Sequence, residues 1–435
     1  MESTQKTTAV KATESARRVR SIVKDLSLRA REAKENGDPV AYCMVASYYD
    51  DILRAMDVVP VWTENYAGLC AAKRDAERFL VKAESDGFTN VLCGYARLGI
   101  GFDALRRELG EVPPDAPDGG MVEPDMLLGS SGTCDPRFKW YQSLGRYMET
   151  PVHSIDIVCP SHDGDLAQVR DYYVKYQTEQ FRGMVSFIEK HTGKKFDPDR
   201  LWEVLNISDE TVRVFWEAYQ LRKAVPCPMP SEDHFNVFVP SFYLMGTQAA
   251  LDFYRDLYRE LEDRVKNRTE VIPDEKYRLL WAGGLPPWHT MWMFNYFESM
   301  GAVFVIETSY RPDDPVEVPS HVKDPVEYLA WRTFLRQTHR YEKALRHSGN
   351  PQVELLLEFV DGYKIDGMVM HASRSCRATT IGQIFLKNLV QEYVPVPAIQ
   401  LVSDIIDVRD YSEAQWKAQI EAFVETVASH KQGRG

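Results

Sequence analysis

Membrane-spanning and export segments are missing from this 435-residue sequence. No stretch approaches the roughly 18 consecutive apolar residues of a membrane helix, and the N-terminus MESTQKTTAV lacks the apolar run of a signal peptide. The net charge of −12 argues against nucleic acid, because proteins that bind it present a basic surface to the phosphates. We therefore expect a cytoplasmic protein that binds neither a membrane nor nucleic acid.

A disulfide framework, internal repeats and a P-loop are lacking as well. The seven cysteines, an odd number scattered along a long chain, suit a reducing compartment rather than a disulfide scaffold. There is no low-complexity tract, no repeat of fixed period and no Gly-x-x-x-x-Gly-Lys-Ser/Thr motif. Hydrophobic residues at 44% and charged residues at 27% are typical of a folded protein, and the length predicts more than one domain.

What the sequence does contain is an alternation of short apolar runs with longer amphipathic segments, which is typical of βαβ units. Near-continuous apolar runs of this length indicate parallel strands that are covered on both faces. The strands expected in the first half are Val40–Val45, Val58–Trp62, Asn90–Cys93, Pro124–Leu128 and Val152–Val158. Those expected in the second half are Tyr277–Trp281, Ala302–Glu307, Ile365–His371 and Ala398–Val402.

Helical patterns fill the intervals and dominate the middle of the chain. Helices are expected at 12–36, Asn65–Ala83, Pro136–Met148, Leu166–His191, Asp199–Leu205, Ser208–Lys223, Thr247–Asn267, Trp288–Met300, Val326–His347, Thr379–Glu392 and Ser412–Ser429. The pattern predicts an α/β fold with two Rossmann-like parallel-sheet domains and an inserted helical region. We place a helical lead and the first α/β domain at 1–163, the helical region at 164–275, and the second α/β domain with its C-terminal helix at 276–435.

Four of the cysteines have settings that suggest no chemistry. Free cysteine is usually a small buried residue. Cys43 lies inside an expected strand and Cys70 inside an expected helix, both among small or apolar neighbours, so we assign them to packing. Cys159 and Cys227 stand beside prolines without a basic neighbour, and we interpret them as structural or solvent-exposed.

Cys93, Cys134 and Cys376 each fall at or just past the end of an expected strand, shortly before a helix. In open α/β sheets, ligands bind at the C-terminal ends of the strands. Helix N-termini and basic neighbours favour the thiolate that ligates metal. The basic neighbours are Arg97, Arg137, Arg374 and Arg377. Three thiolates suit a cubane iron–sulfur cluster with one open iron, although separations of 41 residues (93 to 134) and 242 residues (134 to 376) match no local zinc or ferredoxin pattern.

Glu64 follows an expected strand and precedes an expected helix, so it belongs to the same sheet edge. A carboxylate in that position can transfer protons to a substrate. The alternative is a helix N-terminal charge, a place where glutamate is common.

Several segments together resemble the 2-hydroxyacyl-CoA dehydratase / benzoyl-CoA reductase family, from about residue 38 onward. These segments are Glu64-Asn-Tyr-Ala-Gly, Leu92-Cys-Gly-Tyr-Ala-Arg97, Thr133-Cys-Asp-Pro-Arg-Phe-Lys-Trp-Tyr141 and Ser373-Arg-Ser-Cys-Arg377. Within the family, the chain length and the segment Ser130-Ser-Gly-Thr-Cys-Asp-Pro136 are most similar to the larger cluster-binding subunit of benzoyl-CoA reductases.

The resemblance implies a [4Fe-4S] cluster held by Cys93, Cys134 and Cys376 in the cleft between the two α/β domains, with an acyl-CoA substrate bound near it. It also implies a smaller homologous cluster-binding subunit as partner. Electrons would come from ATP-hydrolysing iron–sulfur activator subunits that ferredoxin reduces, and benzoyl-CoA would become a cyclic dienoyl-CoA. The resemblance favours an acid/base role for Glu64.

Three other functions stay open. The chain can be a subunit of a 2-hydroxyacyl-CoA dehydratase, which removes water from its substrate, or a cluster-free structural subunit of such a complex. The third is a nicotinamide enzyme, because Gly99-Ile-Gly-Phe-Asp-Ala104 has the letters of a dinucleotide fingerprint. That fingerprint normally follows its strand at once, whereas the expected strand ends several residues earlier.

Three further features have two interpretations each. Trp288, Trp292 and Tyr296 share one face of an expected helix, which suits core packing or, less simply, an apolar wall for an aryl ring. His371 ends an expected strand and is either a satisfied core histidine or a proton source near Cys376. The segment Gly283–Pro287 suits a plain strand-to-helix turn or a close backbone approach to a ligand.

Overall fold

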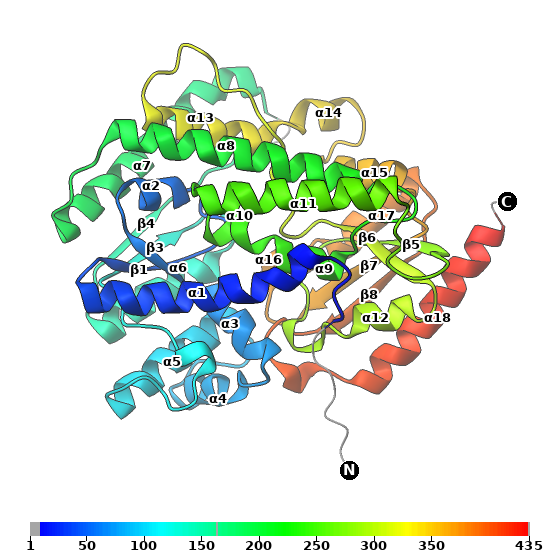
Figure 1. Ribbon diagram of the computed structural model, residues 1–435, viewed down its shortest axis with the longest axis horizontal. Coiled ribbons are helices and arrows are strands. Elements are labelled where there is room, and N and C mark those ends of the chain that lie inside the picture. Colours follow the sequence, from blue (N-terminus) through cyan, green and yellow to red (C-terminus); the bar gives the residue numbers. More distant parts are fainter. Residues whose placement is uncertain (1–8, 162–163, 434–435) are drawn as a thin grey trace.

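Two four-stranded parallel sheets form the frame of the protein in the computed structural model, which describes residues 9–161 and 164–433 (Figure 1). The first sheet consists of β1 (Val40–Cys43), β2 (Val59–Trp62), β3 (Met126–Ser130) and β4 (Val152–Ile155). The second consists of β5 (Tyr277–Trp281), β6 (Ala302–Glu307), β7 (Gly367–Ser373) and β8 (Ala398–Ser403). Their orders, β2-β1-β3-β4 and β6-β5-β7-β8, are the same arrangement used twice, so the prediction of an α/β protein with two Rossmann-like sheets is confirmed.

Helices surround both sheets. Those of the first half are α1 (Glu14–Asn36), α2 (Asp50–Ala55), α3 (Thr63–Ala72), α4 (Glu77–Ser85), α5 (Gly94–Leu109) and α6 (Asp135–Met148). Those of the second half are α12 (Met293–Glu298), α13 (Pro325–Thr338), α14 (Tyr341–Arg346), α15 (Pro351–Gly362), α16 (Arg377–Thr380), α17 (Gln383–Tyr393) and α18 (Glu413–Gln432). No helix within 9–161 or 164–433 is long and apolar enough to cross a membrane.

Between the two sheets the chain is helical, as expected. This region contains α7 (Leu166–Thr192), α8 (Pro198–Leu221), α9 (Ser231–Val237), α10 (Val239–Tyr243) and α11 (Gln248–Lys266). In Figure 1, α8 and α11 run side by side along one side of the molecule and extend from the first half toward the second. The helical region therefore links the two sheets.

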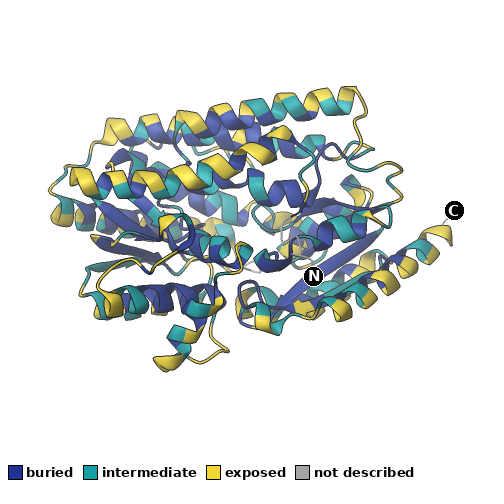
Figure 2. Ribbon diagram, turned by 60° about the horizontal axis from the view of Figure 1, so that its bottom comes forward, coloured by how far each residue is buried: buried dark blue, intermediate teal, exposed yellow. Residues whose placement is uncertain are grey.

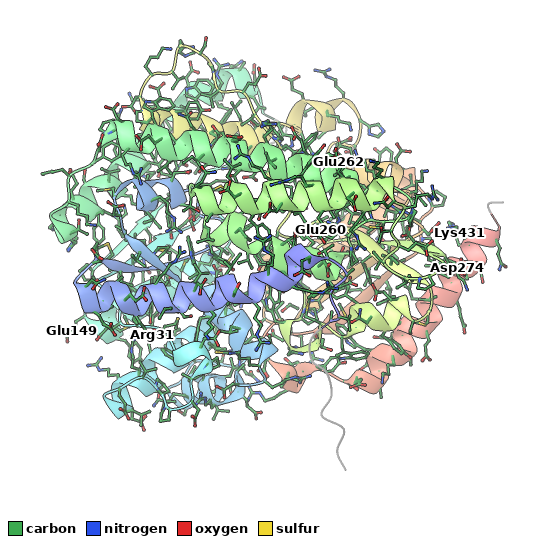
Figure 3. The ribbon with its side chains drawn as sticks, in the orientation of Figure 1. Arg31, Glu149, Glu260, Glu262, Asp274 and Lys431 are labelled. Carbon is green, nitrogen blue, oxygen red and sulfur yellow. The ribbon has the colours of Figure 1, made fainter. Side chains whose placement is uncertain are left out.

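The N-terminal helix α1 is attached to this helical region at its first turn. Glu260 of α11, labelled in Figure 3, accepts hydrogen bonds from the backbone N–H groups of Glu14 (2.6 Å) and Ser15 (2.9 Å). Asp233 of α9 accepts from the backbone N–H of Thr13 at 2.6 Å. These carboxylates satisfy N–H groups that have no partner inside a helix, and they fix where α1 begins.

The strands form the interior of each half, and β1, β3, β6 and β7 are buried along their whole length (Figure 2). One buried ion pair joins the helical region to the second sheet. Arg222, just after α8, donates two hydrogen bonds of 2.7 Å to the carboxylate of Glu307 at the end of β6. Both side chains are fully buried, so removal of either one would leave an uncompensated charge.

The strand expected at Asn90–Cys93 is wrong. Residues 90–92 form turns in which the Leu92 N–H donates to the Thr89 carbonyl at 3.1 Å. Val91 and Leu92 are 63% and 40% exposed, which a strand inside this sheet does not permit. The apolar run is short. The central strands β1 and β3 already have a neighbouring strand on each side, so neither can pair with a further strand.

Several expected helices are divided differently from the prediction. The stretch Asn65–Ala83 contains α3 and α4, which are separated at Arg74 by a positive φ of 60°. Val326–His347 is divided between α13 and α14, and Trp288–Met300 between a 3₁₀ turn and α12. Conversely, the two helices expected between 199 and 223 are one continuous helix, α8. Amphipathic periodicity continues across such breaks, so it does not locate them.

Gly99 and Gly101 lie inside α5, which begins at Gly94, so they do not form the strand-to-helix turn of a dinucleotide site. A Cβ atom on Gly99 would lie 2.2 Å from the Trp140 ring. One on Gly101 would lie 1.8 Å from the backbone oxygen of Phe79 in α4. Both glycines therefore allow α5 to pack closely against its neighbours.

Gly101→Ala is expected to destabilise the protein by about 1–3 kcal/mol, because a methyl group must displace backbone atoms of α4. Urea unfolding followed by circular dichroism measures this loss. Gly382→Ala is the matched control, since a Cβ there has no heavy atom within 4 Å, and its urea midpoint is expected to stay close to that of the wild type. Equal midpoints for the two variants would contradict the packing role of Gly101.

Candidate functional site

Cys93, Cys134 and Cys376 each stand immediately before a helix: α5, α6 and α16, respectively. Cys134 follows β3 and Cys376 follows β7, as predicted. Cys93 follows a turn instead of the expected strand. All three are half-buried free cysteines, so they differ from the packing positions Cys43 and Cys70, which are fully buried as expected.

The three thiols come together from the two halves of the molecule. Burial raises the pKa of Cys93 well above its usual value, and the charges of Cys376 and Cys134 raise it further. The pKa of Cys134 is raised to about 11, chiefly by burial, and the charges of Glu64 and Cys376 contribute to the increase. Each thiol is therefore within electrostatic range of the other two.

Hydrogen-bond donors meet each sulfur atom. The backbone N–H groups of Ala96 and Tyr95 lower the pKa of Cys93, and the backbone N–H and charge of Arg137 lower that of Cys134. Cys376 accepts a hydrogen bond from the Thr379 hydroxyl at 3.2 Å. Such donors stabilise thiolate sulfur.

Within 9–161 and 164–433, no group of three or more His, Cys, Asp or Glu side chains converges on one point where a single ion could bind. Cysteine thiolates are the ligands that hold iron–sulfur clusters, and the site contains three free cysteines with hydrogen-bond donors at their sulfur atoms. The residues present therefore fit the group that the sequence resemblance implies.

Asp404, in the loop after β8, holds the Cys376 loop in place. Its carboxylate accepts hydrogen bonds from the hydroxyl of Ser373 (3.2 Å), from the hydroxyl and backbone N–H of Ser375, and from the backbone N–H of Ile406 (2.9 Å). The Ser375 hydroxyl in turn accepts from the N–H of Gly94, the residue after Cys93, at 3.0 Å. One carboxylate thus connects the loops of two cysteines. Asp404 was not predicted, although its place directly after an expected strand was a usable signal.

The four arginines predicted to favour thiolates have different roles. Arg137 is buried, and its charge lowers the pKa of Cys134, as expected. Arg97 is buried but is paired with Glu84 at 2.7 Å and with Asp407 at 3.3 Å. Arg374 and Arg377 are exposed, and Arg374 forms an ion pair with Asp410. Arg137 therefore has the role that was predicted for all four, since its charge favours the thiolate form of Cys134.

Glu64 lies in the first turn of α3, directly after β2, with its side chain 12% exposed. One carboxylate oxygen accepts from the Val45 N–H at 2.9 Å, and the other lies 3.3 Å from Nε of Arg137. Ser47 and Thr133 accept further hydrogen bonds from Arg137 at 3.2 and 2.7 Å. Glu64 is therefore a positioned carboxylate near Cys134.

Three tyrosines lie close enough to Glu64 for its charge to act on them. Burial raises the pKa values of Tyr95, Tyr243 and Tyr310, and the charge of Glu64 raises each of them further. Glu64 therefore lies among phenols as well as beside a thiol. None of these tyrosines was predicted from the sequence as a site residue.

The aromatic residues Trp288, Trp292 and Tyr296 do not share one face. Trp288 packs against the cores of both halves and donates its indole N–H to the Tyr95 hydroxyl at 2.6 Å. Trp292 and Tyr296 contact each other with ring centroids 5.7 Å apart, and Lys417 of α18 lies over both rings. The 3₁₀ turn before α12 changes the helical period, so only Trp288 reaches the site.

His371 is a satisfied core histidine. Its ring nitrogens lie 2.7 Å from the Leu285 carbonyl and 2.8 Å from the Ser403 hydroxyl, and burial lowers its pKa to about 4. Gly284, with a φ of +83°, passes so close that a Cβ would lie 2.2 Å from the His371 carbonyl oxygen. Gly284 therefore lies in a tight turn after β5 that packs against β7. The structure supports the interpretations of His371 as a core histidine and of Gly283–Pro287 as a plain turn.

A cavity of about 490 Å³ lies away from the cysteines, between α7, α13 and the loop after β6. Its walls include Arg170, Lys175, Arg182 and His321, together with acidic residues of similar number. None of Cys93, Cys134, Cys376 or Glu64 lines it.

Two parallel sheets whose loops bring three free cysteines and a carboxylate together define a two-sheet α/β protein with a cysteine site between its halves. The chain belongs to the family described as 2-hydroxyglutaryl-CoA dehydratase, D-component, which matches residues 47–427. This membership confirms the family that the sequence motifs indicated.

Relatives of known activity cover nearly the whole chain. The (R)-phenyllactyl-CoA dehydratase alpha subunit of Clostridium sporogenes is 26% identical over 95% of this chain and 96% of its own length. The (R)-2-hydroxyisocaproyl-CoA dehydratase alpha subunit of Clostridioides difficile is 26% identical with the same coverage. The B subunit of the benzoyl-CoA reductase of Thauera aromatica is also 26% identical, over 93% of this chain and 92% of its own length.

Proposed function

We propose that this chain is an iron–sulfur subunit of an enzyme that acts on an acyl-CoA thioester. Cys93, Cys134 and Cys376 would hold a [4Fe-4S] cluster between the two halves. The observation that carries the proposal is the approach of three free, hydrogen-bonded cysteines from both halves. The family and its acyl-CoA relatives support the substrate class.

The reaction we propose is the reduction of benzoyl-CoA to a cyclic dienoyl-CoA. Its support is the likeness to the B subunit of a benzoyl-CoA reductase and the sequence Ser130–Pro136. The second candidate is removal of water from a 2-hydroxyacyl-CoA, which the family description and two relatives of equal identity favour. Subunit names among the relatives support a partner subunit, which we propose to be a smaller homologue. ATP-hydrolysing iron–sulfur activator subunits, ferredoxin and a cytoplasmic location complete the proposal.

A bound cluster would supply electrons of low potential, and one of its irons would be open to a ligand. Glu64 would hold and move a proton, and its hydrogen bond from Val45 and pairing with Arg137 fix where that proton is delivered. Trp288 and the neighbouring tyrosines would exclude water from the site, which protects low-potential electrons from reducing protons.

Turnover by the anaerobically assembled complex tests the proposed reaction. The complex receives ATP and a reductant with either benzoyl-CoA or (R)-phenyllactyl-CoA, and the products are identified by mass spectrometry. Consumption of reductant with formation of a dienoyl-CoA is the expected result. Redox-neutral loss of water from phenyllactyl-CoA would establish the dehydratase instead. An active complex in which this chain contains no iron would show that the chain is a structural subunit.

A further inference from the structure

The backbone of Tyr310 adopts an unfavourable conformation close to the candidate site. This residue lies three positions after the end of β6 and has a φ of 59°, in the left-handed region that bulky residues avoid. Such a conformation costs on the order of 1–3 kcal/mol and persists where the surrounding structure imposes it, often at functional sites.

Aromatic neighbours hold the Tyr310 ring in one position. Phe238 stacks on it with ring centroids 4.2 Å apart and planes 19° apart. Phe242 meets it edge-on at 5.4 Å, and Trp288 lies at 6.0 Å. The ring therefore has little freedom to rotate, and its hydroxyl is directed by packing rather than by solvent.

Trp288 connects Tyr310 to the site, because its ring lies 6.0 Å from the Tyr310 ring and its indole N–H donates to Tyr95, two residues after Cys93. Burial raises the pKa of Tyr310 above the ordinary value of tyrosine, the charges of Glu64 and Cys376 raise it further, and a hydrogen bond from Tyr95 opposes this increase. Because the Tyr310 oxygen is the acceptor in its hydrogen bond with Tyr95, its own O–H group stays available as a donor, and the stacked ring fixes where that group lies.

We propose that Tyr310 donates a hydrogen bond to the carbonyl oxygen of the bound acyl thioester. This role rests on the proposed function, since it requires an acyl-CoA beside Cys376 and Glu64. Negative charge develops on that oxygen when the thioester accepts an electron, and a donor already in position stabilises it without reorganisation. Both candidate reactions use an acyl-CoA, so the role does not depend on the choice between them.

Tyr310→Phe tests the role, because phenylalanine keeps the ring and its stacking and removes only the hydroxyl. Tyr328→Phe is the matched control: its hydroxyl donates to Asp209 at 2.7 Å, between α13 and α8. Difference infrared spectra of carbonyl-¹³C-labelled benzoyl-CoA and (R)-phenyllactyl-CoA, bound to the anaerobically prepared protein, report the hydrogen bond directly. The carbonyl band of the accepted thioester is expected at higher wavenumber in Tyr310→Phe than in the wild type or the control.

In turnover by the assembled complex, kcat is expected to fall by about 10²–10³-fold in Tyr310→Phe, as when one oxyanion donor is removed. KM and iron content are expected to stay near the wild-type values. An unchanged carbonyl band and kcat in a folded, iron-loaded variant would overturn the role of Tyr310 and leave the proposed function intact. A wild-type protein that binds neither thioester would overturn the proposed function and this role with it.

Discussion

Cys376→Ala protein, prepared without oxygen, is expected to lose most of its iron and acid-labile sulfide, and Cys93→Ala and Cys134→Ala are expected to do the same. Each change removes one of three thiolates. The two that remain belong to loops that a bound cluster would otherwise hold together across the halves. Iron and sulfide per chain, together with the broad visible absorption of thiolate-ligated iron, measure the loss.

Cys159→Ala is the control for these variants, because Cys159 is an exposed free cysteine whose sulfur lies 2.8 Å from the Tyr341 hydroxyl. It is expected to keep the iron content of the wild type. A full cluster in any of the three ligand variants would remove that cysteine from the proposed set. A wild-type protein without iron would refute the cluster itself.

Two strands of the second sheet, β5 and β6, were predictable because they are apolar runs that are buried along almost their whole length. Tyr277–Trp281 and Ala302–Glu307 form strands with the predicted bounds. The same reasoning failed at Asn90–Cys93, where a short apolar run is exposed in a turn. Hydrophobic periodicity indicates which faces of a segment are buried, but a run of only a few apolar residues does not by itself identify a strand. The expected domain boundaries stay a prediction.

The site was predictable only in part. Ligands of parallel sheets bind at the C-terminal ends of the strands, and this rule correctly predicted that Cys134 and Cys376 each follow a strand. Cys93 was included although the strand that was assigned to it does not exist. The hydrogen bond from the Gly94 N–H to the Ser375 hydroxyl joins the loops of Cys93 and Cys376 across a separation of 281 residues, which no local sequence pattern predicts. Tyr310 was missed because its position depends on stacking against the helical region.

Glu64→Gln is expected to lower kcat by about 10²–10⁴-fold, the usual contribution of a positioned general acid or base, while the iron content is unchanged. Glutamine can still accept the hydrogen bond from Val45 but can neither carry the proton nor neutralise Arg137. Stopped-flow and steady-state kinetics of the assembled complex measure the loss.

The loss of charge also leaves a buried arginine unpaired, so destabilisation must be separated from chemistry. Glu275→Gln is the matched control, because Glu275 pairs with Arg278, accepts the Cys227 N–H at 2.7 Å and has a side chain that is 4% exposed. It precedes β5, so it lies at the N-terminal ends of the strands, whereas the site lies at their C-terminal ends. Both variants are expected to unfold at a lower urea concentration than the wild type. The free energy of unfolding is expected to fall by a few kcal/mol, the usual cost of breaking a buried ion pair. Only Glu64→Gln is expected to lose turnover in the folded state, and equal kcat values in the two variants would assign Glu64 to structure alone.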